Sequence, residues 1–167
     1  VSPDKTNGIL NTGFYLFDDD GALIDGQFAN WKGQNCYIVK GQPHYAGVLH
    51  YKGKLIYVGS NCEMNTGVCY VSAKAGNGIL NEGFYYFTED GSLLESGFAT
   101  WTDGETYYFK HGQRFAAGVV EVEEKIYYIS GSCQFATGKH FVSEKKGNGI
   151  LKEGYYEFGT DGVLIRR

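Results

Sequence analysis

The sequence predicts an all-β protein, a solenoid of stacked β-hairpins built from repeats of about 20 and about 30 residues. Three observations lead to this prediction. Glycine supplies 25 of the 167 residues and aromatic residues supply 16 %, a composition that disfavours helices and favours pleated strands. An 18-residue motif occurs three times along the chain. Short aromatic runs also alternate with glycine-containing turns, which is the pattern of β-hairpins.

The repeated motif begins Asn-Gly-Ile-Leu and occupies residues 7–24, 77–94 and 148–165. The second copy matches the first at 12 of 18 positions, and the third matches it at 11 of 18. Repeat units end near residues 26, 47, 67, 97, 118, 138 and 167, so residues 1–167 are expected to form a single repeat module. A unit this short cannot bury an apolar face alone, so its neighbours must cover it.

Each unit is expected to contribute one hairpin, made of an aromatic run, a turn and a second apolar run before the closing glycine. This gives seven hairpins, whose aromatic runs start near Phe14, Cys36, Ile56, Phe84, Tyr107, Ile126 and Tyr155. Aligning the seven runs on their turns produces three columns of residues. Because strand side chains alternate between faces, the first and third columns share one face.

The third column contains no polar atom, so we expect it to form the core; it reads Phe17, Ile38, Val58, Phe87, Phe109, Ile129 and Phe158. The first column shares that face and reads Tyr15, Cys36, Ile56, Tyr85, Tyr107, Tyr127 and Tyr156. The middle column tolerates a glutamate, so we expect it to be at least partly exposed; it reads Leu16, Tyr37, Tyr57, Tyr86, Tyr108, Tyr128 and Glu157. These tyrosines either pack across strands or stack on a ligand.

Composition and charge exclude several classes of partner. The net charge is -4, with no basic cluster, so neither nucleic acid nor an anionic membrane surface is an expected partner. No run of about 18 apolar residues is present, which argues against membrane insertion. The chain opens with Val-Ser-Pro-Asp and lacks an initial Met, so we expect a fragment of a larger protein.

No catalytic constellation can be assembled from the sequence. The four histidines face different residue types in the neighbouring period, so they do not belong to the repeated framework. The carboxylates concentrate before glycines, as in Asp20-Gly21 and Asp90-Gly91, where they suit turns. We therefore expect no enzyme, no metal site and no cofactor.

The four cysteines leave one plausible pair, Cys62 with Cys69. Cys62 and Cys133 are equivalent positions three units apart, too far for a bridge in a stack of hairpins. Cys36 occupies a column otherwise filled by Tyr and Ile, so it is interpreted as a small core residue. We expect at least two free thiols and a fold that survives a reductant.

Units such as residues 97–118 (GFATWTDGETYYFKHGQRFAAG) and 118–138 resemble the cell-wall-binding, or choline-binding, repeat superfamily. The resemblance extends from Asn7 to Ile165. The alternation of short and long repeats is similar to the receptor-binding tails of clostridial toxins and to glucan-binding repeats. It implies a β-hairpin solenoid on a secreted or cell-surface bacterial protein, attached to cell-wall polysaccharide or another glycan. The tryptophans that form choline cages in that superfamily are missing here, so choline itself is not the expected ligand.

Two interpretations of function follow. The first is a non-catalytic cell-wall or glycan-binding module, and the alternative is a structural stalk or protein-adhesion module without a small-ligand site. A site is expected where a long unit meets the following short unit, because the added residues must bend the stack and create a concavity. The candidate residues are Trp101, Tyr86, Tyr108, Trp31, Asp103, Glu105 and Lys110. In the opposing interpretation the tryptophans pack structurally and the polar residues cap a turn.

Overall fold

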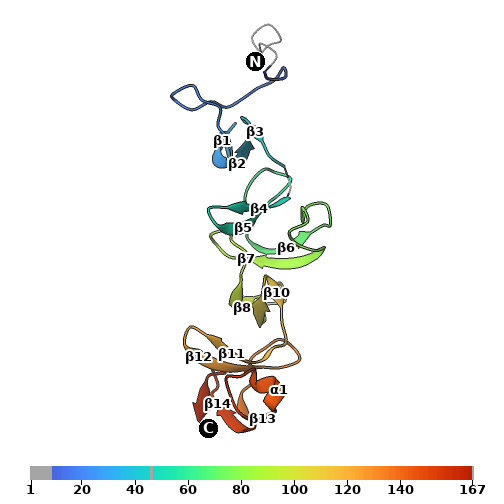
Figure 1. Cartoon of the computed structure of the whole chain (residues 1–167), viewed down its shortest axis with the longest axis vertical. Helices are drawn as coiled ribbons and strands as arrows, with labels where there is room; N and C mark the ends of the chain where they lie inside the picture. The colour runs from blue at the N-terminus through green and yellow to red at the C-terminus, as the bar shows by residue number, and fades with distance from the viewer. Residues whose placement is uncertain (1–8, 46, 167) are drawn as a thin grey trace. The chain divides into compact units, whose positions relative to one another are not determined.

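The structure, a computed structural model, describes residues 9–45 and 47–166. It is nearly all β, as predicted, and its strands form a series of short antiparallel sheets (Figure 1). The chain divides into two compact units. We call residues 1–83 with 87–92 the N-terminal unit, and residues 84–86 with 93–167 the C-terminal unit.

Seven strands precede residue 88: β1 (Gln27–Trp31), β2 (Gln34–Val39), β3 (Gln42–Pro43), β4 (Gly47–Tyr51), β5 (Lys54–Val58), β6 (Gly67–Val71) and β7 (Gly83–Phe87). They pair as β1-β2-β3, β4-β5 and β6-β7. The following elements are β8 (Ser96–Thr100), β9 (Thr106–Lys110), β10 (Gln113–Arg114), β11 (Gly118–Val122), β12 (Lys125–Ile129), β13 (Gly138–Val142), the helical turn α1 (Glu144–Gly147), β14 (Gly154–Phe158) and β15 (Leu164–Arg166). These strands pair as β8-β9-β10, β11-β12 and β13-β14-β15.

The prediction of which runs form each main hairpin was partly wrong. The aromatic run pairs over five residues with the strand that precedes it, as β8 does with β9. Its pairing with the apolar run that follows is short: two residues in β9-β10, and a single bridge between Ile129 and Phe135. The cause is turn chemistry. Lys52-Gly53 and Glu123-Glu124 have positive φ at both residues, as in the type I′ turns that match strand twist.

The core consists of small clusters between successive hairpins, and the two units repeat them. In the N-terminal unit Tyr37, Ile56 and Val58 are buried together. The equivalent cluster of the C-terminal unit contains Tyr108, Val120 and Ile129. The third column is buried as predicted at Ile38, Val58, Phe87, Phe109, Ile129 and Phe158.

Phe17 is the exception in the third column, because its side chain is 42 % exposed. Its equivalents Phe87 and Phe158 are covered by tyrosine rings of preceding hairpins, with Tyr57 and Tyr128 centroids 6.0 and 6.1 Å away. No described hairpin precedes Phe17 to cover it in this way. It makes a single bridge to Leu23 rather than a regular hairpin.

The middle column is more buried than predicted at two positions. Tyr37 and Tyr108 are 8 % and 4 % exposed, because each lies between hairpins against other rings. Tyr37 contacts Phe28 and Tyr51 edge-to-face, and Tyr108 contacts Phe98 in the same way. The Tyr108 hydroxyl pairs with Ser96 Oγ at 3.1 Å, which satisfies its polar end. Tyr57, Tyr86 and Tyr128 are half-buried and Glu157 is exposed, as expected.

A disulfide joins Cys36 to Cys62, so the pairing of Cys62 with Cys69 was wrong. Cys36 is buried, as predicted, but it is a bridged cysteine rather than a free packing residue. The cause lies in how hairpins stack. The Tyr37 amide donates to the Cys62 carbonyl at 2.8 Å, which places the Cys62 turn beside the first column of the previous hairpin. The same bond recurs from Tyr108 to Cys133. Tyr107 occupies the place equivalent to Cys36, so Cys133 has no cysteine opposite it and is free, like Cys69.

Candidate functional site

Trp101 is packed on both sides. Its ring stacks on Phe109 with centroids 5.8 Å apart and planes 28° apart. The Arg114 guanidinium lies 4.8 Å from the Trp101 centroid and equally close to that of Tyr107. These contacts favour a structural role for Trp101, because its ring packs against both the Phe109 ring and the Arg114 guanidinium.

Asp103 and Glu105 belong to the turn that follows Trp101. The Glu105 amide donates to Asp103 Oδ1 at 3.0 Å, and the Tyr107 hydroxyl donates to Asp103 Oδ2 at 2.9 Å. The hydrogen bond from the Glu105 amide is the main cause that lowers the pKa of Asp103. The hydrogen bond to Asp103 is the main cause that raises the pKa of Tyr107. Glu105 accepts from Gln134 Nε2 at 3.3 Å. Asp103 therefore caps a turn.

The other predicted residues lie in three different places. Trp31, in the N-terminal unit, packs against the Cys36, Ile38 and Cys62 cluster. Tyr86 packs against Phe109 with ring centroids 5.4 Å apart. Tyr108 and Lys110 line a third place, a surface depression of about 590 Å³ in the C-terminal unit. We take that depression as the candidate site, because it includes two of the predicted residues.

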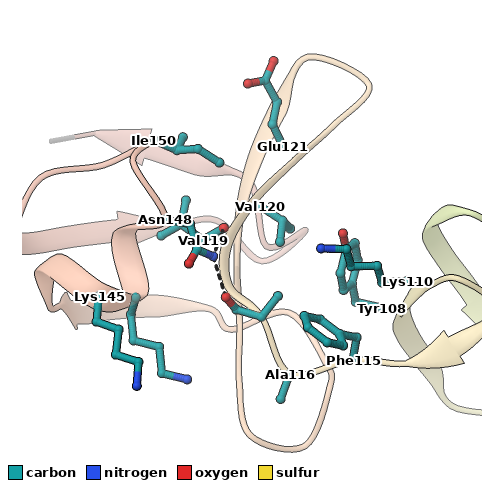
Figure 2. A pocket seen from close by; sticks show the side chains of 12 residues that line it. Tyr108, Lys110, Phe115, Ala116, Val119, Val120, Glu121, Lys145, Asn148 and Ile150 are labelled. Atoms are coloured by element: carbon teal, nitrogen blue, oxygen red, sulfur yellow. Dashed lines mark hydrogen bonds between the residues drawn. The ribbon is translucent and has the colours of Figure 1, made fainter.

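We call this depression the joint pocket. Its lining comes from β9, β11, the connection before β11 and the segment around α1, and comprises Tyr108, Lys110, Phe115, Ala116, Ala117, Val119, Val120, Glu121, Lys145, Lys146, Asn148 and Ile150. Figure 2 shows the chain from Ala116 to Val120 running between two groups of side chains. Tyr108, Lys110 and Phe115 lie on one side of it, and Lys145, Asn148 and Ile150 lie on the other. The site is thus an open surface depression with side chains on both sides of a central segment, rather than an enclosed cleft.

Asn148 of the third Asn-Gly-Ile-Leu motif holds the two sides of the joint pocket together. Its φ of 50° is left-handed, and its Nδ2 donates to the carbonyls of Ala117 and Val119 at 2.5 and 2.7 Å (Figure 2). Gly118 lets the two segments approach closely, since a Cβ there would lie 2.6 Å from the Lys146 carbonyl oxygen. In the N-terminal unit Asn77 makes the equivalent bond to Val48 O at 3.0 Å.

We expect Asn148→Ala to lower the free energy of unfolding by about 1 to 3 kcal/mol, because two backbone carbonyls, one of them part-buried, lose their donor. Denaturant unfolding measures this loss. Asn148→Gly keeps the left-handed backbone accessible and should lose less than the alanine variant. Asn77→Ala is the matched control and should lose less, since it removes one bond. A loss of about 0.5 kcal/mol or below for Asn148→Ala, typical of surface substitutions, would contradict this role.

Sequence reasoning missed Phe115, Lys145, Lys146 and Asn148 as site residues. The repeat comparison held the signal for Asn148, because the motif places an asparagine at each long unit. Phe115 falls in a loop before the closing Gly118, where the sequence pattern does not single it out. Within the described residues no group of three or more His, Cys, Asp or Glu side chains is arranged to hold a metal ion.

Neither a protein-family model nor a curated protein sequence matches the chain. Solved structures do. Choline binding protein F from Streptococcus pneumoniae is 20 % identical with a TM-score of 0.47, over 91 % of this chain and 44 % of that protein. The modular autolysin LytC from Streptococcus pneumoniae, in complex with a synthetic peptidoglycan ligand, is 16 % identical with a TM-score of 0.50, over 92 % and 36 %.

A second structure of LytC gives 14 % identity and a TM-score of 0.51, over 91 % of this chain and 36 % of that protein. The chain therefore spans less than half the length of these two proteins. At these identities the LytC alignments establish the fold. The chain therefore shares the fold of the part of LytC that it matches, which agrees with the predicted fold of stacked β-hairpins.

Proposed function

We propose that this chain is a non-catalytic module that binds bacterial cell-wall polysaccharide or a related glycan, as part of a secreted or cell-surface protein. The joint pocket is the observation that carries the proposal. It combines an exposed aromatic ring with several hydrogen-bonding side chains on one open surface. That is the combination by which proteins hold small polar ligands that also have apolar faces.

Phe115 is the aromatic platform of the joint pocket, and its side chain is 42 % exposed. Sugar rings present patches of C–H groups that pack on an aromatic face, while their hydroxyls need donors and acceptors nearby. Lys110, Glu121 and Asn148 border the same surface and supply such groups. The fold gives independent support, since it is shared with an autolysin whose structure contains a peptidoglycan ligand.

The charge of the chain is consistent with the expectation that nucleic acid is not a partner, because the net charge is -4. Among the described residues no helix has the length and apolar character to span a bilayer.

We expect the chain to be retained by purified bacterial cell walls or by glycans on an array, and Phe115→Ala to lower that retention about tenfold, as expected for a lost stacking contact. Thermal melting should change little, because the ring is exposed. His44→Ala is the matched control, since His44 occupies the equivalent position in the N-terminal unit. Equal retention of wild type and Phe115→Ala, or no retention of either, would contradict the proposal.

The stalk or adhesion alternative has one observation in its favour. Phe141 and Tyr155 face each other on β13 and β14, with ring centroids 5.2 Å apart, and are 49 % and 65 % exposed. Exposed aromatic pairs of this kind favour contacts with another protein surface. If the chain is not retained by any glycan but self-associates with rising concentration in sedimentation experiments, this alternative takes the place of the proposed function.

A further inference from the structure

The joint pocket is locally basic on an acidic chain. Lys110, Lys145 and Lys146 all line it, against the single carboxylate of Glu121, although the whole chain carries a net charge of -4. None of the three lysines forms an ion pair within the part of the chain that the structure describes. Their ammonium groups are exposed and have hydrogen-bond donors to offer.

The lysines approach the pocket from both sides. Lys110 ends β9, and its Nζ lies 5.3 Å from the centroid of the Phe115 ring. Lys145 and Lys146 lie on α1. Figure 2 shows Lys145 on the other side of the segment from Ala116 to Val120. Ala116 and Ala117 lie between the two groups of side chains. Because their own side chains are small, they leave a depression there. The backbone that carries Lys145 and Lys146 is fixed, because Asn148 ties the end of α1 to β11.

The equivalent region of the N-terminal unit has the same backbone arrangement around an asparagine but fewer lysines. Its depression is smaller, about 210 Å³, and is lined by Tyr45, Ser72, Lys74, Ala75 and Asn77. Asn77 still makes the joining hydrogen bond there. In the sequence, Lys145 corresponds to Lys74, but Lys146 corresponds to Ala75 and Lys110 to Val39. The joining hydrogen bond of this region therefore forms without Lys110 and Lys146, whose charges are particular to the C-terminal unit.

We infer that the joint pocket of the C-terminal unit takes an anionic saccharide, and this inference rests on the proposed glycan-binding function. The sugar ring packs on Phe115, and an acidic group of the same chain of sugars is bound by the ammonium groups of Lys145 and Lys146. A carboxylate, as in a uronic acid, and a phosphate, as in a phosphate-linked glycan, both present acceptor oxygens with negative charge. The N-terminal joint lacks two of the three positive charges and does not share this preference.

The test compares matched ligand pairs. The full chain is titrated with an oligouronate and with its carboxyl-reduced neutral form, and separately with a phosphate-bearing glycan and its dephosphorylated form. We expect the acidic member of at least one pair to bind about tenfold or more tightly, the size of effect that charge-assisted hydrogen bonds produce. The pair that shows the difference identifies the acidic group. The preference should shrink as ionic strength rises, because the lysines are exposed.

The variant K145Q/K146Q should lose the preference for the acidic ligand while binding of the neutral ligand stays within about twofold, since the aromatic contact remains. Lys74→Gln is the matched control in the N-terminal unit and should behave like wild type. Equal binding of acidic and neutral ligands, or a preference that survives in K145Q/K146Q, overturns the inference but leaves glycan binding intact. Binding to no glycan at all overturns the proposed function with it.

Discussion

Replacing Phe109 by alanine is expected to destabilise the C-terminal unit by about 3 to 5 kcal/mol, the usual range for emptying a buried phenylalanine site. Phe109 is fully buried. Its ring contacts Trp101 at 5.8 Å and Tyr86 at 5.4 Å between centroids, so the truncated side chain leaves a cavity between flat rings that cannot collapse into it. Chemical denaturation followed by tyrosine and tryptophan fluorescence measures the loss.

Phe115→Ala is the matched control for this measurement, because it removes the same side chain from a surface position six residues away. It should lower the free energy of unfolding by less than about 1 kcal/mol. A Phe109→Ala loss as small as that of Phe115→Ala would show that the third column does not form the core.

Removing the disulfide is expected to have the second-largest effect. Cys36 and Cys62 are 26 residues apart, and closing a loop of that length contributes about 3 to 4 kcal/mol through the unfolded state. Cys62→Ser should therefore lower stability by that order, and reductant should do the same to wild type. Cys133→Ser is the matched control, because Cys133 is the equivalent residue of the C-terminal unit and is not bonded.

Two free thiols are expected when the unreduced chain is unfolded and its thiols are counted. Four free thiols, or a melting temperature that does not respond to reductant, would contradict the bridge. A response of Cys62→Ser to reductant equal to that of wild type would place the disulfide elsewhere.

The fold class was predictable because the repeat is strong at the positions that matter for packing. Third-column residues such as Ile38, Phe87 and Phe158 are apolar in every unit and buried where described hairpins flank them. The aromatic runs alone did not predict whether each run pairs mainly with the strand before it or with the run after it. That pairing depends on two-residue turns such as Glu123-Glu124, where neither residue is a glycine and the positive φ values leave little trace in the sequence.

The disulfide was missed for a related reason. Cys62 with Cys69 was the pair that remained once Cys133 was judged too distant and Cys36 was interpreted as a core residue, whereas stacking brings Cys62 to Cys36 of the preceding hairpin. The stacking hydrogen bond from Tyr37 to Cys62 uses backbone atoms only. Because this bond does not depend on side-chain identity, the sequence gives no sign of it. The Cys36–Cys62 pairing could be recognised only from how successive hairpins stack in three dimensions.

The candidate site was partly predictable. Tyr108 and Lys110 line the joint pocket, but that pocket joins short units to the long unit that comes after them, not a long unit to the following short unit. Ligand binding by these two residues stays a prediction. Trp101 was chosen for its size and flatness, but its faces are used by Phe109 and Arg114. Lys145 and Lys146 were not chosen, because their place opposite Lys110 depends on the bonds that Asn148 makes across the joint.

Glycan binding at the joint pocket can be tested most directly by nuclear magnetic resonance. The isotopically labelled chain is titrated with the glycan that retains it best, and amide shifts are mapped onto the sequence. We expect the largest shifts at residues 110–121 and 144–150, with much smaller ones at the equivalent residues of the N-terminal unit. Shifts concentrated around Trp101 or around Phe141 and Tyr155, or no shifts on addition of any glycan, would contradict binding at the joint pocket.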